Sequence, residues 1–299
     1  RPEDPASDRA LVQRRSRRGE TDPRDEPEDD GQTKGFAGEE WRSATASGYT
    51  PPMFSDREIE RYARHLVLRD LGGPGQQRLK RASVLVIGAG GIGAAAAPCL
   101  VAAGVGRVAL VDFDAVSLSN LQRQTLYAEA DVGRSKVEVA RERLSGLNGD
   151  VVVEAIEARA DGSNLDALVA GRDAVLDGCD RFETRLLVSD ACVRAGVPLV
   201  SAAIARWDGR LGVFAGRPCY RCLVAEVPPD EETCQAVGVI GPLAGVVGAR
   251  AALETVKLLS GAGDPGLGVL EIFEGLSGAT RRVRVAADPG CPACGTDRR

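Results

Sequence analysis

The chain has 299 residues, of which 43% are hydrophobic and 27% are charged, a balance that is typical of soluble globular proteins. Its formal net charge of −5 argues against general nucleic-acid binding, which usually needs a basic surface. No apolar run reaches the roughly 20 residues of a membrane-spanning helix, and no secretory pattern opens the chain. We therefore expect a cytoplasmic protein with no nucleic-acid or membrane partner.

The first 52 residues differ in composition from the rest of the chain. They are rich in charged residues, Pro, Gly and Ser, and they show almost no apolar periodicity. Such a segment cannot bury enough surface to offset its ordering entropy, so we expect residues 1–52 to form a disordered tail. Because Met53 is the only methionine, we interpret the tail as a dispensable extension or as not native. Residues 53–299 are expected to form one domain.

Helical and strand patterns alternate from residue 55 onward. After the capping pair Ser55-Asp56, apolar residues from Ile59 to Val67 recur at helical spacing. Short apolar segments predict strands at 83–88, 107–112, 151–156, 174–177 and 199–203, and helices are predicted between them, at 88–103, 136–147, 165–169 and 182–195. This alternation predicts an α/β fold of the Rossmann-like, doubly wound type, with a mainly parallel sheet covered on both faces.

The pattern changes after residue 203. Strands are predicted at 210–216, 269–273 and 280–285, and a polar, proline-containing loop at 227–234. The segment 241–260 is helical but apolar almost all round, which predicts deep burial or a subunit interface. Cys99, Cys179 and Cys192 fall in apolar patterns and are expected to be small core residues.

A glycine-rich turn follows the first predicted strand. Gly88, Gly90 and Gly93, with Gly91 between them, fit G-x-G-x-x-G, in which glycine lets the backbone approach a phosphate and the helix N-terminus offers amide donors. Asp112 ends the next strand, where a carboxylate can accept hydrogen bonds from ribose hydroxyls. These residues predict a nucleotide site, although a nicotinamide-dependent oxidoreductase would share them.

Polar and basic residues after the second strand favour a triphosphate as the ligand. The segment 112–127 carries Asn120, Arg123 and Gln124, and Lys136 begins the next predicted helix. A reaction that releases pyrophosphate develops negative charge on the leaving group, which guanidinium and ammonium groups stabilise. Arg123 and Lys136 suit that task.

Asp180 follows the fourth predicted strand, at the edge where open α/β sheets bind their ligands. A carboxylate there can hold Mg²⁺, which prefers oxygen ligands and commonly bridges protein and phosphate. A helix N-cap is the structural alternative for this aspartate.

Two CxxC pairs predict a metal site. Four thiolates in two short chelates match a closed tetrahedral zinc site with a structural role; the four ligands are Cys219, Cys222, Cys291 and Cys294.

These motifs together resemble the MoeB/ThiF family, bacterial relatives of the ubiquitin-activating enzymes. In the family's order and spacing, residues 55–295 contain GAGGIG, DFDAVSLSNLQRQ, VGRSKVE, CYRC and GCPAC. The resemblance implies an ATP-dependent adenylyltransferase that activates the C-terminal glycine of a ubiquitin-like sulfur-carrier protein, MoaD-like or ThiS-like. The carrier then becomes a thiocarboxylate for molybdopterin or thiamine biosynthesis, with sulfur from a donor such as a cysteine desulfurase or a rhodanese-like protein.

The resemblance also implies roles for individual residues. Asp112 holds the ribose of ATP, and Asp180 is the essential acidic residue associated with Mg²⁺. Arg64 reaches the ATP of the neighbouring subunit in a homodimer, and Cys234 can form a thioester or persulfide link to the carrier. The phosphate contacts fall to Asn120, Arg123 and Lys136, and Gln124 is added to the ATP-binding residues. The family usually has Asn where this chain has Arg181.

Three other functions remain open at this point. The glycine turn and Asp112 also fit an oxidoreductase, a tRNA-modifying dehydratase of the same superfamily also adenylates a carboxylate, and an inactive scaffold would keep the fold alone. The adenylation hypothesis requires that Asp180, Arg123 and Lys136 share one cavity beside residues 88–93.

Overall fold

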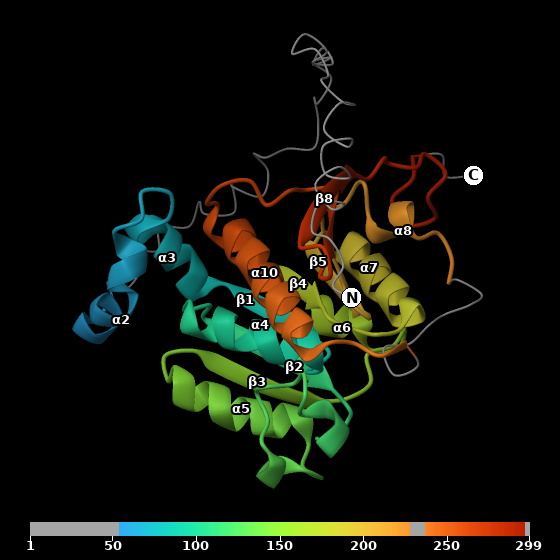
Figure 1. The fold of residues 1–299 in the computed structure, drawn as a ribbon. Helices are drawn as coiled ribbons and strands as arrows, with labels where there is room; N and C mark the ends of the chain where they lie inside the picture. Colours follow the sequence, from blue (N-terminus) through green and yellow to red (C-terminus); the bar gives the residue numbers. More distant parts are fainter. Residues whose placement is uncertain (1–53, 228–236, 297–299) are drawn as a thin grey trace, which may run out of the picture. The chain divides into compact units, whose positions relative to one another are not determined.

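The computed structural model describes residues 54–227 and 237–296, and its centre is an eight-stranded sheet (Figure 1). The predicted tail at 1–52 and Cys234 lie outside the described residues. The strand order is β3-β2-β1-β4-β5-β6-β7-β8. The strands are β1 (Ser83–Ile87), β2 (Arg107–Asp112), β3 (Val152–Glu157), β4 (Ala174–Asp177), β5 (Leu199–Ala205), β6 (Asp208–Phe214), β7 (Val269–Glu274) and β8 (Ala279–Arg284).

The sheet is parallel from β3 to β5 and antiparallel from β5 to β8. This confirms the mainly parallel, Rossmann-like sheet that the sequence predicted, and the antiparallel strands are its C-terminal extension. Parallel neighbours need a crossover between them, and four helices supply the crossovers: α4 (Gly91–Ala102), α5 (Lys136–Leu147), α6 (Leu165–Val169) and α7 (Phe182–Ala195). The other described α-helices are α2 (Asp56–Leu66) and α3 (Gly72–Arg81), which precede β1, and α8 (Tyr220–Leu223) and α10 (Gly241–Ser260), which lie between β6 and β7.

The central parallel strands are buried on both faces, as in a doubly wound fold. In β1, Val84 and Val86 belong to the core that includes residues of α4, α5 and α10, whereas Leu85 and Ile87 belong to the core with α6 and α7. Successive residues of a strand point to opposite faces, so a strand that is buried on both sides reads as a continuous apolar run.

Helix α10 packs closely on α4 (Figure 1), so the predicted burial holds for this side of the helix. A side chain at Gly248 would meet the Cβ atom of Ala95 and the carbonyl oxygen of Ile92, each at 2.7 Å, so glycine is required at this crossing. Val246 and Leu253 on the other side of α10 are 45% and 50% exposed. None of the helices in the described ranges is both long and apolar enough to cross a bilayer.

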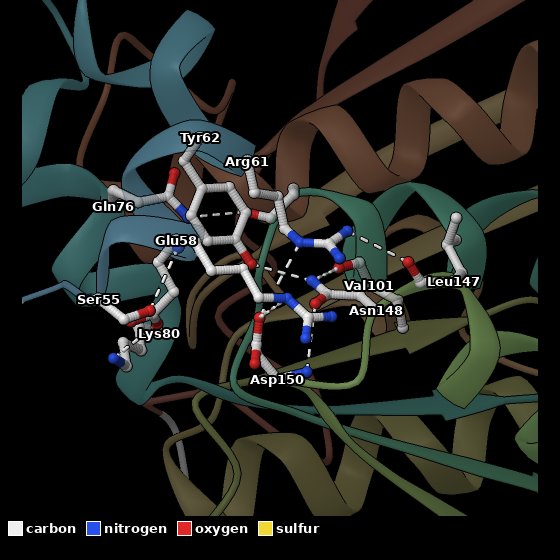
Figure 2. A network of polar contacts seen from close by, with 12 residues as sticks. Ser55, Glu58, Arg61, Tyr62, Gln76, Lys80, Val101, Leu147, Asn148 and Asp150 are labelled. Carbon is white, nitrogen blue, oxygen red and sulfur yellow. Dashed lines mark hydrogen bonds and ion pairs between the residues drawn. The ribbon is translucent and has the colours of Figure 1, made fainter.

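Helix α2 is attached to the domain mainly by polar contacts (Figure 2). The buried Asn148 donates to the Tyr62 hydroxyl and to the carbonyl oxygen of Val101, both at 2.9 Å. Glu58 accepts from Lys80 at 2.6 Å and also forms a capping box with Ser55. These contacts fix α2 through its polar residues.

One core prediction was wrong. Cys192 is buried and Cys179 is half-buried, but Cys99 is exposed on α4. Helix α4 is rich in alanine and apolar all round, so its sequence does not mark the side that faces solvent.

Candidate active site

A cavity of about 510 Å³ lies at the carboxyl ends of β1, β2 and β4. This volume falls in the usual range for small-molecule sites. Asp180, Arg123 and Lys136 all line it beside the glycine turn, so the structure brings together the three residues on which the adenylation hypothesis depends. Other lining residues that the sequence predicted are Gly88, Gly90, Gly91, Asp112, Asn120 and Gln124.

The glycine turn is shaped by one left-handed residue and one close contact. Gly88 has φ +88°, which side chains other than glycine rarely adopt. A Cβ atom at Gly93 would lie 1.9 Å from the carbonyl oxygen of Gly88, so only glycine lets α4 begin so close to β1. Gly93 does not line the cavity. Its role in this structure is to allow the close contact between the start of α4 and the end of β1.

Asp112 is held rigidly at the end of β2. Its two carboxylate oxygens accept from the amides of Ala89 at 2.7 Å and Asp114 at 2.8 Å. On the other side of the turn, the Tyr127 hydroxyl donates to the carbonyl oxygen of Ala89 at 2.8 Å. Burial raises the pKa of Tyr127, and the nearby Asp112 raises it further, so this hydroxyl keeps its proton and its hydrogen bond.

Lys136 is a buried cation at the start of a helix. It is 4% exposed, and its Nζ atom donates to Asp114 Oδ2 at 2.8 Å. Because it is the first residue of α5, its ammonium group adds to the positive end of the helix dipole. The Asp114 side chain is 52% exposed, so water also reaches this counter-ion. A phosphate group that enters the cavity can therefore bind the Lys136 ammonium group alongside Asp114.

Arg123 and Gln124 border the glycine turn from the opposite side. Arg123 donates to the carbonyl oxygen of Ser119 at 3.1 Å, and its Cγ and Cδ atoms lie 3.6 Å from the position of a Cβ atom on Gly91. Gln124 is 2% exposed, yet its Oε1 atom accepts no hydrogen bond from any described residue. A buried polar atom without a partner is costly, so Gln124 is suited to meet a hydrogen-bond donor of a ligand.

Asp180 lies in the loop between β4 and α7. Its side chain is exposed, and the N-cap position of α7 belongs to Arg181, without a side-chain capping bond. The N-cap interpretation of Asp180 is therefore wrong. Arg181 lines the cavity as well, so the departure from the family pattern adds a cation to the site.

The loop is supported by residues that no sequence motif predicted. Asp177 is fully buried and accepts from the amide of Cys179 at 2.9 Å, and Arg185, only 4% exposed, also lines the cavity. The guanidinium group of Arg159 stacks on Phe113, 3.9 Å from the ring centroid, and both residues line the cavity. No local signal marked Arg185, because α7 also carries the charged residues Glu183, Asp190 and Arg194.

The four cysteines of the CxxC pairs converge on one point. Their Sγ atoms all lie within 4.8 Å of one another, with 3.6 Å between Cys219 and Cys291 and 3.4 Å between Cys222 and Cys294. Tetrahedral zinc with Zn–S bonds of about 2.3 Å needs sulfur atoms about 3.8 Å apart. The arrangement fits zinc.

Arg64 is exposed on α2 and does not line the cavity of its own chain. Its predicted contact is with a neighbouring subunit, and that contact stays a prediction. The covalent role of Cys234 also stays a prediction, because this residue lies outside the described ranges.

Comparisons with known proteins agree on one family. The profile of the ThiF family matches residues 62–293. The chain is 43% identical to the molybdopterin-synthase adenylyltransferase of Escherichia coli (strain K12) over 244 residues, which cover 81% of this chain and 98% of the relative. It is 42% identical to the sulfur carrier protein ThiS adenylyltransferase of the same organism, with 81% and 97% covered.

Two further comparisons extend this similarity. The sulfur carrier protein adenylyltransferase of Thermus thermophilus is 44% identical over 253 residues, which cover 82% of this chain and 93% of the relative. Among solved structures, E. coli MccB with MccA-N7isoASN matches with a TM-score of 0.72 and 24% identity, covering 81% of this chain and 76% of that chain. This structural match supports the fold.

Proposed function

The chain belongs to the ThiF family, and we propose that it is an adenylyltransferase that uses ATP to activate the C-terminal glycine of a ubiquitin-like sulfur-carrier protein. The observation that carries the proposal is the single cavity that contains Asp180, Arg123, Lys136 and the glycine turn. An oxidoreductase would need only the turn and Asp112.

In the proposed reaction, an oxygen of the glycine carboxylate attacks the α-phosphorus of ATP, the bond to the β-phosphate breaks, and pyrophosphate leaves. A carboxylate is already ionised at neutral pH, so the site needs no general base, in keeping with a chain that has one histidine. The acyl-adenylate that forms has an activated carbonyl carbon. The persulfide of a sulfur donor, such as a cysteine desulfurase or a rhodanese-like protein, then attacks this carbon and displaces AMP. A thiol reductant cleaves the resulting acyl disulfide and leaves the thiocarboxylate.

Different residues of the cavity bind different parts of ATP. Asp112 accepts from the ribose hydroxyls, and the amides at the start of α4 bind phosphate oxygens. Asn120, Arg123 and Lys136 contact the phosphates, where positive charge stabilises the departing pyrophosphate. The buried Oε1 atom of Gln124 is an acceptor for a donor group of the nucleotide.

Asp180 is the proposed ligand of Mg²⁺, since its exposed carboxylate borders the same cavity as the phosphate-binding residues. The metal would supply charge neutralisation at the phosphates. Zinc is the proposed metal of the four-cysteine cluster, where it would tie the C-terminal segment to α8. Such a reduced thiolate cluster suits a cytoplasmic protein.

Two parts of the proposal concern other molecules. We expect a homodimer in which Arg64 of one subunit contacts the ATP of the other, and we expect Cys234 to be the residue for any covalent link to the carrier. Replacing Cys234 with serine tests that link, because unchanged sulfur transfer would remove the residue from the mechanism.

ATP–pyrophosphate exchange with purified carriers tests the function. The proposal predicts exchange that depends on a carrier with an intact C-terminal glycine, and the comparison of MoaD-like with ThiS-like carriers would assign the pathway. No exchange with any carrier would refute the proposal. The two E. coli relatives, named for molybdopterin synthase and for ThiS, are 43% and 42% identical to this chain, so sequence similarity does not choose between the pathways.

A further inference from the structure

A buried arginine ties the loop that follows β4 to the neighbouring strand β5. Arg185 lies in the first turn of α7 and is 4% exposed. Its guanidinium group donates to the carbonyl oxygen of Ala202 at 2.7 Å and to Ser201 Oγ at 3.2 Å, both in β5. It also donates to the carbonyl oxygen of Cys179 in the loop. One side chain therefore holds two adjacent segments of the sheet together.

Asp177 holds the same arginine from the end of β4. Its Oδ2 atom lies 3.6 Å from Nη1 of Arg185, and both side chains are buried, at 0% and 5% exposure. That oxygen also accepts from the Ser201 hydroxyl at 3.2 Å, so one serine bonds both charged groups. Two charges lose their hydration on burial, and their attraction offsets this cost only when the geometry is good and further hydrogen bonds complete it. We therefore read the pair as a device that fixes geometry.

The two charged side chains bind both polar backbone groups of Cys179, the residue before Asp180. Asp177 Oδ1 accepts from the Cys179 amide at 2.9 Å, and Arg185 donates to the Cys179 carbonyl oxygen. This carbonyl belongs to the peptide bond that joins Cys179 to Asp180, and a peptide group is planar. Holding the carbonyl oxygen therefore also fixes the direction in which the chain enters Asp180.

The terminal nitrogens of Arg185 are engaged by protein acceptors. Nη2 donates to the two carbonyl oxygens, while Nη1 donates to Ser201 and faces Asp177. A guanidinium group stays charged in proteins and presents its N–H donors in a rigid fork, so these contacts determine its orientation. Arg185 lines the cavity, but these donors hold the protein itself, which leaves phosphate binding to other cations.

We propose that Arg185 is a positioning residue for adenylation, which holds the peptide bond before Asp180 so that the carboxylate faces the cavity. Asp177 and Ser201 orient Arg185 for this task. The inference rests on the proposed function, because it needs a reaction in which Asp180 takes part. Arg185 then acts through Asp180 and not by contact with ATP or the carrier.

The variant Arg185→Lys tests the proposal. Lysine keeps a positive charge beside Asp177, but a single ammonium nitrogen cannot reproduce the fork that bonds both segments. We expect kcat of pyrophosphate exchange to fall about 10-fold and the Mg²⁺ concentration for half-maximal exchange to rise, because Asp180 is the proposed metal ligand. KM for ATP at saturating Mg²⁺ should change less than about 2-fold. Hydrogen–deuterium exchange of the peptide that spans 178–185, measured without nucleotide, should become faster.

The variant Ser201→Ala gives a milder test that leaves both charges in place. Ser201 is 4% exposed and does not line the cavity, so its hydroxyl acts on the site through Arg185 and Asp177. We expect kcat to fall about 3-fold, because the ion pair itself remains. The Mg²⁺ dependence and the deuterium exchange of 178–185 should change in the same directions as in Arg185→Lys.

The variant Arg172→Lys is the matched control. Arg172 also connects separate elements, because it donates to Ser83 Oγ and to a carboxylate oxygen of Glu154, each at 3.0 Å. It does not line the cavity, and Ser83 begins β1, whereas the cavity lies at the carboxyl ends of the strands. We expect kcat, the Mg²⁺ dependence and the deuterium exchange of 178–185 to stay at their wild-type values, even if Tm falls.

Three outcomes for Arg185→Lys would overturn the proposal. Unchanged kcat with unchanged deuterium exchange at 178–185 would show that Arg185 positions nothing. A lower Tm with unchanged kcat and Mg²⁺ dependence would reduce its role to stability. A higher KM for ATP at unchanged kcat would make it a ligand of ATP.

Two provisions keep the test decisive. If Arg185→Lys does not fold, Ser201→Ala decides by the same measurements. A wild-type chain without pyrophosphate exchange would refute the proposed function, whereas wild-type exchange that both variants retain in full would refute only the role of Arg185.

Discussion

Replacing Lys136 with methionine should abolish most of the activity while leaving the fold intact. Methionine keeps the apolar stem of the side chain and removes its charge. The proposed site uses that charge against the departing pyrophosphate. We therefore expect catalysis and stability to respond very differently to one substitution.

The structure sets the size of both effects. Lys136 is 4% exposed and borders the cavity, so its loss should cost about 2.7–4 kcal/mol of transition-state stabilisation, or 10²–10³-fold in kcat, as for other groups aimed at developing charge. Its partner Asp114 has a side chain that is 52% exposed and can be hydrated when the ammonium group is gone. The free energy of unfolding should therefore change by only about 1 kcal/mol, which is about 2–4 °C in Tm for a domain of this size.

The assay is carrier-dependent ATP–pyrophosphate exchange, with thermal unfolding measured on the same samples. Arg134→Met is the matched control, because Arg134 is a surface cation paired with Glu142 at 2.6 Å and does not line the cavity. We expect its exchange rate to stay within about 2-fold of the wild type. An exchange rate for Lys136→Met within about 3-fold of the wild type, in a folded protein, would refute the role that we give to Lys136.

Three further predictions concern the turn, the metal and α2. Gly93→Ala should lower Tm and weaken ATP binding, because its Cβ atom would lie 1.9 Å from the Gly88 carbonyl oxygen; thermal unfolding and ATP titration would check it. The Cys219→Ser variant should contain less zinc than the wild type, as measured by metal analysis, and should unfold at a lower temperature. Burial raises the pKa of Cys219 to about 11, so the metal must displace protons, and chelators should extract zinc more readily as the pH falls. Burial alone would raise the pKa of Glu58, but its bonds with Lys80 and Ser55 outweigh this and lower it from 4.5. Its contribution is therefore present above pH 4.5 and lost as the pH falls through the lower, folded-state pKa, so the Tm difference between Glu58→Gln and the wild type should shrink in acid.

The features that the sequence predicted best are those encoded within a few neighbouring residues. The glycine turn needs Gly88 at a left-handed position and Gly93 near the start of α4, and each CxxC pair is a local chelate. The strands that are buried on both faces are continuous apolar runs. In each case the cause of the structure lies within the motif itself, so no distant residue has to be known.

The supports of the Asp180 loop could not be predicted in this way. Arg185 and Asp177 come from α7 and β4, and their meeting depends on how these elements pack. An arginine on α7 is typical of a solvated helix surface. Only the three-dimensional contacts show that Arg185 is buried against Asp177 and lines the cavity.

Helix α2 shows a stronger limit, because its apolar periodicity marks the buried side only in part. The amphipathic rule places apolar residues inward, which holds for Tyr62, yet Ile59 and Val67 are 47% and 78% exposed and the charged Glu58 is buried. The inward positions are determined by Lys80 and Asn148, which offer an ion pair and a hydrogen bond where an apolar surface would be expected. Periodicity can therefore predict that this helix exists, but its orientation follows from polar partners in α3 and after α5 that a local pattern does not contain.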